Sequence, residues 1–424
     1  MSKLKQFIHN STVTTLLKFV SAGLKFLIII YVTNQFGASE YGAYTFAMSV
    51  FLLINLIFRY GFDVFIQKEA ASFELQRKYI KSISQFFQIT YFSVISLLLV
   101  TFMVEMILYY FSNNIDQLKY QYLSLLLLFS FSYSILWIFT YYYRGIGKGK
   151  LSVLNLEIIF PIVQVMSIYI LLQFDLQIFQ ILIYSFVIAI FISLIIYFNG
   201  IKNRYNQLKK VSFIKLLKLE TKYFRQSYPF LLVSMSSMLL AWTDIYVISY
   251  FETNENIGIY SVVTKIGLLI LFPASAVSIF FSNKVVEFLQ INDYKQLHKY
   301  FKIATVSLFI VSMFMFIFIN FFSSIILSLF GDIFMSATTV LLLFSLAQLI
   351  NGTSGVFESI FLMSDLKNIL MKLNILMLVV NLMLNIPLVY MYGIKGAAIA
   401  TLIVISINRL IQYLIIRKRY FVKK

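Results

Sequence analysis

The chain alternates long apolar segments with short polar ones. Each apolar segment has about 20 or more mostly apolar residues, enough to cross the hydrocarbon core of a bilayer as an α-helix. The strands of a membrane β-barrel would be shorter and would alternate apolar with polar positions. The pattern therefore predicts an all-α integral membrane protein with twelve transmembrane helices, at residues 12–34, 41–66, 83–111, 121–143, 151–172, 177–199, 228–250, 258–282, 303–330, 337–362, 371–391 and 394–416.

The two halves of the chain share a short motif. Gly42-Ala43-Tyr44 opens the second predicted helix of the first half, and Gly258-Ile259-Tyr260 opens the second predicted helix of the other half. Two copies of six helices have the same orientation in the membrane. We therefore expect two six-helix lobes, residues 1–199 and 228–424, related by a pseudo-twofold axis along the membrane normal.

The segment 200–227 separates the two expected lobes. It is rich in Lys and carries apolar residues such as Phe213 and Leu217. These features fit an amphipathic helix at the membrane interface, and they also fit a solvated connector. Both interpretations of this linker stay open.

The basic residues indicate which polar segments face the cytoplasm. Of the 35 Lys and Arg, 28 fall in the two terminal segments and in alternate loops, whereas the opposite loops hold only Lys119 and Lys395. Positive charge accumulates on the cytoplasmic side of membrane proteins. We therefore expect a multi-pass membrane protein with both termini in the cytoplasm. The net charge of +18 is then a topology signal, and we expect no nucleic-acid partner.

Composition excludes several classes of protein. Hydrophobic residues make up 60% of the chain and charged residues 12%, which is too apolar for a soluble protein of this size. The chain has no Cys, so thiol catalysis and cysteine metal sites are excluded. The only imidazoles, His9 and His298, lie in separate polar segments. We accordingly expect no metal site, no catalytic residues and no cofactor.

Some basic residues lie inside the predicted helices, where a charge facing lipid costs about 2.5–3.5 kcal/mol. We expect them to face the interior of the protein or a cavity, where Arg and Lys suit phosphate groups. Lys18 and Lys25 are two helical turns apart and share one face. Lys18 and Arg409 also lie where a side chain can reach the cytoplasmic interface. The set is Lys18, Lys25, Arg59, Lys265 and Arg409.

Acidic residues inside the helices offer an alternative interpretation of these cations. Arg59 and Asp63 are four residues apart on a helix and are spaced to form an ion pair. Glu105, Glu157 and Glu358 lie near helix ends and can reach the interface. Transport coupled to Na⁺ or H⁺ needs an acidic group, and we take Asp63, Asp244 and Glu358 as the coupling-ion or gating candidates.

Five short motifs in order carry a resemblance to a known family. Phe36-Gly37-Ala38-Ser39-Glu40-Tyr41-Gly42-Ala43-Tyr44 resembles "LGxxEYGxY", and Tyr392-Gly393-Ile394-Lys395-Gly396-Ala397-Ala398-Ile399-Ala400-Thr401 resembles "YGIxGAAIAT". Between them lie Tyr228-Pro229-Phe230, then Thr243-Asp244 before Ile257-Gly258-Ile259-Tyr260, and Phe330-Gly331. The set is similar to Wzx-type polysaccharide repeat-unit flippases of the multidrug/oligosaccharidyl-lipid/polysaccharide exporter superfamily.

The resemblance implies a MATE-like fold and a flippase working by alternating access. Such proteins move undecaprenyl-diphosphate-linked oligosaccharides from the cytoplasmic to the outer leaflet, for surface polysaccharides such as O-antigen. The implied partners are the lipid-linked oligosaccharide, membrane lipid and other polysaccharide-assembly proteins. Related lipid II flippases have a cationic cavity lined by their first, second and eighth helices. Lys18, Lys25, Arg59 and Lys265 resemble that set in placement; Arg409 has no such match.

Two other functions stay open. A drug or cation antiporter on the same fold needs acidic cavity residues, which the chain also has. A membrane polysaccharide polymerase or glycosyltransferase needs a sizeable outside loop with clustered charges. The predicted outside loops are too short for that chemistry, so we expect the protein not to be an enzyme.

Overall fold

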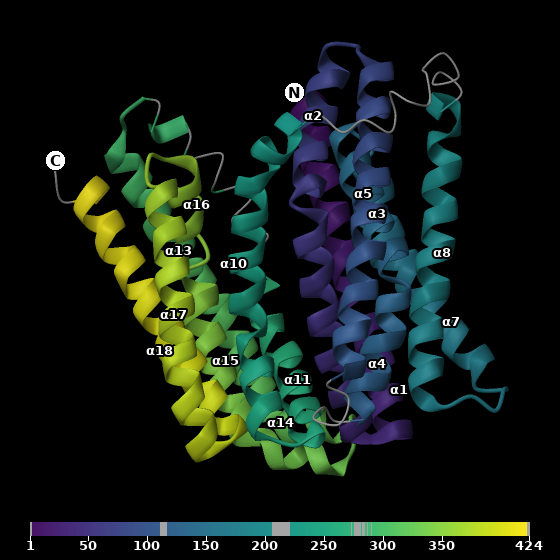
Figure 1. Ribbon diagram of the computed structural model, residues 1–424. Coiled ribbons are helices and arrows are strands. Elements are labelled where there is room, and N and C mark those ends of the chain that lie inside the picture. The colour runs from purple at the N-terminus through teal and green to yellow at the C-terminus, as the bar shows by residue number, and fades with distance from the viewer. Residues whose placement is uncertain are drawn as a thin grey trace. The chain divides into compact units, whose positions relative to one another are not determined.

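The computed structural model describes residues 2–110, 117–205, 221–272, 274, 281, 285, 287–289 and 291–421. These residues form helices and turns and no strands (Figure 1). The all-α class of the fold is therefore confirmed for the described part of the chain. The twelve predicted apolar segments fall mainly on helices, and short turns interrupt several of them. Residue 111 of the third segment and part of the end of the eighth lie outside the described residues.

Eight helical segments of the described chain are long and apolar enough to cross a membrane, which makes this a multi-pass membrane protein. Part of the difference from the expected twelve arises because some predicted helices are joined and others are divided. The first two share one continuous segment, Val20–Ile57, and the fourth is divided between two shorter helices. The eighth ends as a regular α-helix at Leu268.

The chain forms two compact units. Unit 1 contains residues 1–29 and 46–235, and unit 2 contains residues 30–45 and 236–424. The expected lobe boundaries at 199 and 228 stay a prediction. Most of the expected interfacial helix or connector, residues 206–220, lies outside the described residues.

Unit 1 is built mainly from the helices of the first half of the chain. Its elements are the two ends of α1 (Ser2–Arg59), α2 (Phe62–Leu75), α3 (Tyr79–Tyr110), α4 (Gln117–Leu128), α5 (Ser130–Gly145), α6 (Gly149–Leu154), the π-helical turn η2 (Asn155–Ile159), α7 (Phe160–Leu171), α8 (Ile178–Tyr205) and the first half of α10 (Thr221–Phe251). Helix α5 packs against α2, α3 and α8 through buried aromatic side chains. The rings of Phe139 and Tyr197 stack at 5.9 Å, which joins α5 to α8.

Helix α1 bends sharply at Gly37, where the backbone has φ of +82° and ψ of 169°. A residue with a side chain would be strained in this conformation, and Gly adopts it without a steric penalty. The bend lies between the first two predicted transmembrane segments. It explains how one helical stretch contains both of them, with the part from residue 30 to residue 45 belonging to unit 2.

Unit 2 contains most of the second half of the chain. Its elements are the second half of α10 (Thr221–Phe251), α11 (Asn254–Leu268), the 3₁₀ turn η4 (Leu269–Leu271), α13 (Tyr294–Phe321), α14 (Ser323–Ser328), the 3₁₀ turn η5 (Asp332–Ala337), α15 (Thr338–Thr353), α16 (Phe357–Met363), α17 (Lys367–Tyr392), α18 (Ile394–Ile416) and the π-helical turn η6 (Arg417–Phe421). Helix α18 contacts both α15 and α17 and lies beside them (Figure 1).

Small residues allow α18 to pack closely at its start. Gly396, Ala397, Ala398 and Ala400 are all buried. A methyl group added at Gly396 would overlap the carbonyl oxygen of Leu388. Small residues let the backbones of membrane helices approach each other. The second quoted motif therefore serves helix packing in this unit.

Candidate functional site

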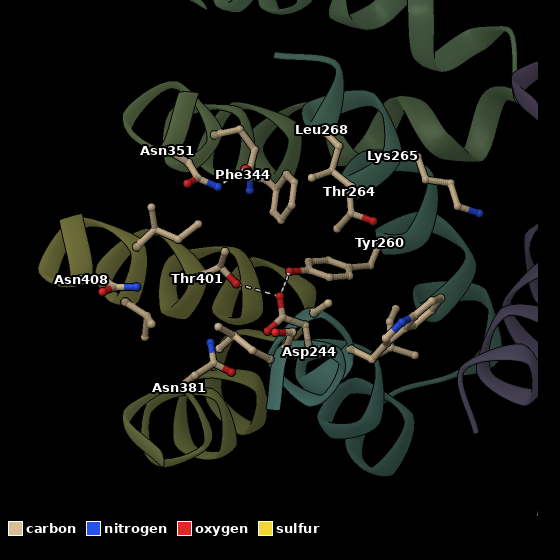
Figure 2. A pocket seen from close by; sticks show the side chains of 18 of the residues that line it. Asp244, Tyr260, Thr264, Lys265, Leu268, Phe344, Asn351, Asn381, Thr401 and Asn408 are labelled. Carbon is tan, nitrogen blue, oxygen red and sulfur yellow. Dashed lines mark hydrogen bonds between the residues drawn. The ribbon is translucent and has the colours of Figure 1, made fainter. Parts of the chain in front are cut away.

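A cavity of about 600 Å³ lies inside unit 2, lined by residues of α10, α11, α15, α16, α17 and α18 (Figure 2). All four candidate residues from the second half of the sequence line it: Asp244, Lys265, Glu358 and Arg409. The structure thus brings together charged side chains that the sequence places on four different helices. We refer to this space as the unit 2 cavity.

Asp244 projects from α10 between α11 and α18 (Figure 2). Thr401 Oγ1 donates a hydrogen bond to its Oδ2 at 2.7 Å, and the Tyr260 hydroxyl donates to the same oxygen. Asn385 Nδ2 donates to Oδ1 at 2.7 Å. Three donors from three other helices therefore hold one buried carboxylate.

Within the described part of the chain, no cationic side chain pairs with Asp244. Its charge is balanced by neutral donors, an arrangement that accommodates a proton or a small cation more readily than an existing ion pair does. Oxygen atoms of Asn381 and Asn385 lie in the same cluster, and Asn385 Oδ1 is buried without a partner among the described residues. Oxygen donors of this kind suit hard cations.

Lys265 lies on α11 and points away from Asp244 (Figure 2). Its Nζ donates a hydrogen bond to the hydroxyl of Tyr41 and lies 4.9 Å from the centroid of that ring. Tyr41 belongs to the first quoted motif and to unit 2. The ring holds the ammonium by a cation–π contact, and the half-buried side chain keeps access to the cavity.

Arg409 on α18 connects the two halves of a broken helix. Its Nη2 and Nε donate to Asn351 Oδ1 at 2.6 and 3.1 Å, near the end of α15. The same Nη2 lies 2.9 Å from Glu358 Oε1, near the start of α16. Nη1 donates to Gln412 Oε1 at 2.7 Å. Arg409 is therefore engaged on every side by protein groups.

In unit 1 the pair Arg59 and Asp63 is buried. Their side chains are each 7% exposed, and Nη1 and Oδ2 lie 3.1 Å apart. The guanidinium lies over the ring of Trp137 at 5.2 Å, and Nε donates to the carbonyl of Asn55 at 3.2 Å. The ion pair predicted from the i,i+4 spacing is confirmed.

Lys25 is paired with an acidic residue of a distant helix. Its Nζ lies 2.8 Å from Glu157 Oε2, which also accepts a hydrogen bond from Ser21 at 2.6 Å. Glu157 sits in the π-helical turn η2, just before Pro161. Such turns are frequent at functional sites because they redirect a side chain. The Lys25 side chain is 53% exposed, and Glu157 is 26% exposed.

The candidate cations are divided between the two units. Lys18, Lys25 and Arg59 belong to unit 1, and Lys265 and Arg409 belong to unit 2. Lys18 lies on α1, and its side chain, like that of Glu105 on α3, is outside the described part. The expected meeting of Lys18, Lys25, Arg59 and Lys265 in one cavity stays a prediction. The expectation that Glu157 reaches the membrane interface also stays a prediction, and the structure pairs its carboxylate with Lys25.

The sequence did not single out the donors around Asp244. Tyr260 and Thr401 both lie in the quoted motifs, so the signal was present there without a role attached to it. Asn385 was detectable as an amide inside an apolar helix. The described residues contain no group of three or more His, Asp or Glu side chains placed to hold a metal ion.

Comparisons with known proteins agree with this architecture. Residues 7–280 match the family described as polysaccharide biosynthesis protein. A curated relative, "Probable low-salt glycan biosynthesis flippase Agl15" of Haloferax volcanii, is 23% identical over 214 residues, which cover 50% of this chain and 44% of the relative. The match thus spans less than half of that protein's length.

Solved structures show the same fold at low sequence identity. An inward-facing MATE-family multidrug resistance transporter of the MOP superfamily gives a TM-score of 0.74 at 14% identity, covering 96% of this chain and 94% of that one. The lipid II flippase MurJ, in an inward closed conformation, gives 0.70 at 16% identity, covering 96% and 87%. The MATE-like fold is therefore confirmed. Since the family match covers more than half of the sequence, the chain belongs to the polysaccharide biosynthesis protein family.

Proposed function

We propose that this protein is a flippase that moves lipid-linked oligosaccharides across a bacterial inner membrane by alternating access, for the synthesis of a surface polysaccharide. The observation that carries the proposal is the unit 2 cavity, in which Asp244, Lys265, Glu358 and Arg409 meet inside apolar helices. Charges at membrane depth mark the path of a polar substrate or ion. Family membership and the flippases among the similar proteins support this function.

The substrate class follows from the cationic side chains that can exchange their present partner for an anion. Lys25 and Lys265 each have one main partner and are partly exposed, so they are free to exchange it for an incoming anion. In unit 1, a diphosphate such as that of undecaprenyl diphosphate would compete with Glu157 for Lys25, and in unit 2 Lys265 can give a phosphate oxygen a charge-assisted bond. We assign these two lysines to the phosphates. Arg59 and Arg409 are held by several protein groups and fit positioning roles better.

The energy source we propose is a proton or Na⁺ bound at Asp244. The carboxylate and the nearby amide oxygens of Asn381 and Asn385 form a small oxygen-rich cluster with no cation from the described residues. A cation that binds there would shift the equilibrium between transporter states if the cluster changes geometry between them. Asp244→Asn should abolish any dependence of export on the ion gradient, and retained dependence would contradict this role.

The test of the function is a strain that lacks the gene. We expect lipid-linked oligosaccharide to accumulate on the cytoplasmic leaflet, and the wild-type protein to restore export. A strain with normal surface polysaccharide and no stranded intermediate would rule out the flippase. Export must be normalised to membrane-inserted protein, because a poorly inserted variant lowers export without any defect in transport.

A MATE-type drug or cation antiporter is the second candidate. The unit 2 cavity favours it in one respect, because Asp244 lines this cavity together with the rings of Trp242, Tyr260 and Phe344, a suitable environment for an organic cation. The same deletion strain separates the two functions. An antiporter predicts increased sensitivity to cationic drugs with unchanged polysaccharide, and the flippase predicts the reverse.

A further inference from the structure

The unit 2 cavity contains three amide side chains whose nitrogens have no assigned role. Gln348 on α15 and Asn381 on α17 are each 3% exposed, and Asn408 on α18 is 9% exposed. All three line the cavity. Among the described residues, the side-chain nitrogen of each of the three has no hydrogen-bond partner. We call Gln348, Asn381 and Asn408 the inner carboxamides.

The oxygen atom of each inner carboxamide is fixed by a second amide about one turn further along the same helix. In all three pairs the second amide donates its nitrogen to the oxygen of the first at 3.1 Å. The pairs, donor first, are Asn351 to Gln348, Asn385 to Asn381 and Gln412 to Asn408. In each pair, the NH₂ group of the inner carboxamide is therefore left without a hydrogen-bond partner among the described residues.

Charged residues set the direction of these pairs. A guanidinium has donors only, so the oxygens of Asn351 and Gln412 must face Arg409. Their nitrogens are therefore left to donate to the inner carboxamides of α15 and α18. Asn385 likewise donates to the carboxylate of Asp244 and to Asn381. Arg409 and Asp244 thus orient three NH₂ groups without needing to touch a ligand themselves.

An unpaired amide nitrogen inside a membrane protein costs free energy, and it persists where it faces a polar solute or water. Three such donors with fixed orientation favour a ligand with several acceptor oxygens, because little ordering is needed on binding. The volume of about 600 Å³ falls in the range of roughly 300–1,000 Å³ typical of small-molecule sites. Trp242 and Phe344 add apolar walls.

A phosphate group fits this part of the protein poorly. Arg409 is already bonded to Glu358, Asn351 and Gln412, and Lys265 points away from Asp244 (Figure 2). An anion beside the inner carboxamides would therefore meet the carboxylate of Asp244, which would repel it. A neutral sugar ring offers what the site requires: hydroxyl, ring and acetamido oxygens as acceptors, and apolar faces for the aromatic walls. We propose that the inner carboxamides bind one sugar ring of the transported oligosaccharide. The inference rests on the proposed flippase function and separates the sugar contacts from the lysines assigned to the diphosphate.

Trp242 provides a direct readout of occupancy. The chain has two Trp, and Trp137→Phe leaves Trp242 in the cavity as the only one. The probe is the oligosaccharide released from its lipid carrier by mild acid and added to the full-length protein in nanodiscs. We expect a saturable fluorescence change with a dissociation constant of roughly 1–10 mM, as suits a single sugar ring held by a few hydrogen bonds.

The variants Gln348→Met and Asn408→Leu remove two donors and keep similar shape. Each should weaken binding roughly threefold to tenfold and lower export per inserted molecule. Asn55→Leu is the matched control, because Asn55 is a buried amide of unit 1 whose nitrogen and oxygen are both bonded to protein groups, so both readouts per inserted molecule should stay unchanged. The two substitutions are also combined in a double variant. If the double variant inserts poorly, Gln348→Glu is tested in its place, because a Glu side chain has the same shape as Gln and replaces the NH₂ donor with an acceptor oxygen.

Two outcomes separate this inference from the proposed function. If the deletion strain strands lipid-linked oligosaccharide but the double variant binds the released glycan and exports it like the wild type, the sugar site is wrong and the flippase stands. The same holds if Trp242 shows no response to the glycan. If the deletion strain strands nothing, the flippase function itself fails.

Discussion

The backbones of Gly42 and Gly258 lie against each other inside unit 2. A methyl group added at Gly42 would lie 2.7 Å from the backbone nitrogen of Gly258 and would overlap the carbonyl oxygen of Asn254. A methyl group added at Gly258 would overlap the carbonyl oxygen of Ala38. The two Gly residues of the motif shared by the halves of the chain are thus the contact point of two helices, α1 and α11, at a spacing that no larger residue permits.

We predict that Gly42→Ala and Gly258→Ala each destabilise the protein by about 1–3 kcal/mol or more, because the added methyl group forces the two backbones apart. Thermal unfolding in detergent or nanodiscs measures the effect. Gly23→Ala is the control and should not destabilise the protein. Its added methyl group meets nothing within 4 Å, and Ala has a higher helix propensity than Gly. If the unfolding temperatures of Gly42→Ala and Gly258→Ala both equal that of the wild type, the two backbones can separate at little cost and the prediction is wrong.

The Lys25–Glu157 pair predicts an ordered series of transport defects. Because Lys25 is assigned to a phosphate, Lys25→Arg should keep substantial export, Lys25→Ala should lose most of it, and Lys25→Glu should lose more. Glu157→Gln should preserve export, since it removes a competitor of the substrate. Export per inserted molecule is the measurement. Normal export by a Lys25→Ala, Lys265→Ala double variant at normal abundance would exclude the cationic mechanism.

Arg59 provides the contrasting case. It is buried against Asp63 and Trp137, so Arg59→Lys should lower the amount of folded protein more than the export per molecule. Asp63→Asn is run beside it, because it removes the same pair from the other side. A large loss of export per molecule at normal abundance in Arg59→Lys, but not in Asp63→Asn, would restore Arg59 as a substrate contact.

Arg409→Met should destabilise unit 2 by roughly 2–4 kcal/mol, because it leaves the oxygens of Asn351 and Gln412 without their donor. Glu358→Gln should cost much less, since its side chain is 46% exposed and water replaces the lost partner. The midpoint of thermal unfolding distinguishes the two. Equal effects would mean that the Arg409–Glu358 ion pair, rather than the hydrogen bonds from Arg409 to Asn351 and Gln412, stabilises the junction between α15 and α16.

Asp365, in the turn before α17, predicts a pH effect. The Tyr420 hydroxyl donates to it at 2.8 Å and Arg419 Nη2 at 2.6 Å. These two groups lower the pKa of Asp365 below its usual value. Its contribution to stability is therefore present above the unfolded pKa and is lost as the pH falls through the lower folded pKa. Protease cleavage at η6 should increase over that window in the wild type, and Asp365→Asn should show the increased cleavage at neutral pH.

The topology is testable because the chain has no Cys of its own. Lys299 on α13 and Glu255 on α11 are both exposed near the start of a helix. We predict that Glu255→Cys reacts with an impermeant thiol reagent added outside the cell and that Lys299→Cys reacts only after the membrane is opened. The opposite pattern would invert the proposed orientation, in which both termini are cytoplasmic.

The elements of the fold could largely be predicted from the sequence, whereas the partners of the charged residues could not. Long apolar segments predict helices, and the i,i+4 spacing of Arg59 and Asp63 predicts their ion pair. Both signals are local in the sequence. Lys25 and Glu157 are separated by 132 residues, and Arg409 and Asn351 by 58. Such pairs depend on how helices pack, and the apolar pattern does not encode which faces meet. The guanidinium of Arg409, which connects the ends of α15 and α16, is another partner of this kind.

The position of α18 in the chain has a consequence for biogenesis. Arg409, Thr401 and Asn408 all belong to this helix, which the ribosome completes after every other helix of unit 2 described above. Until α18 is inserted, Asp244 lacks one of its donors and the ends of α15 and α16 lack the side chain that connects them. Nascent unit 2 is therefore an incomplete bundle whose polar groups lack partners in the bilayer, which costs free energy until α18 inserts.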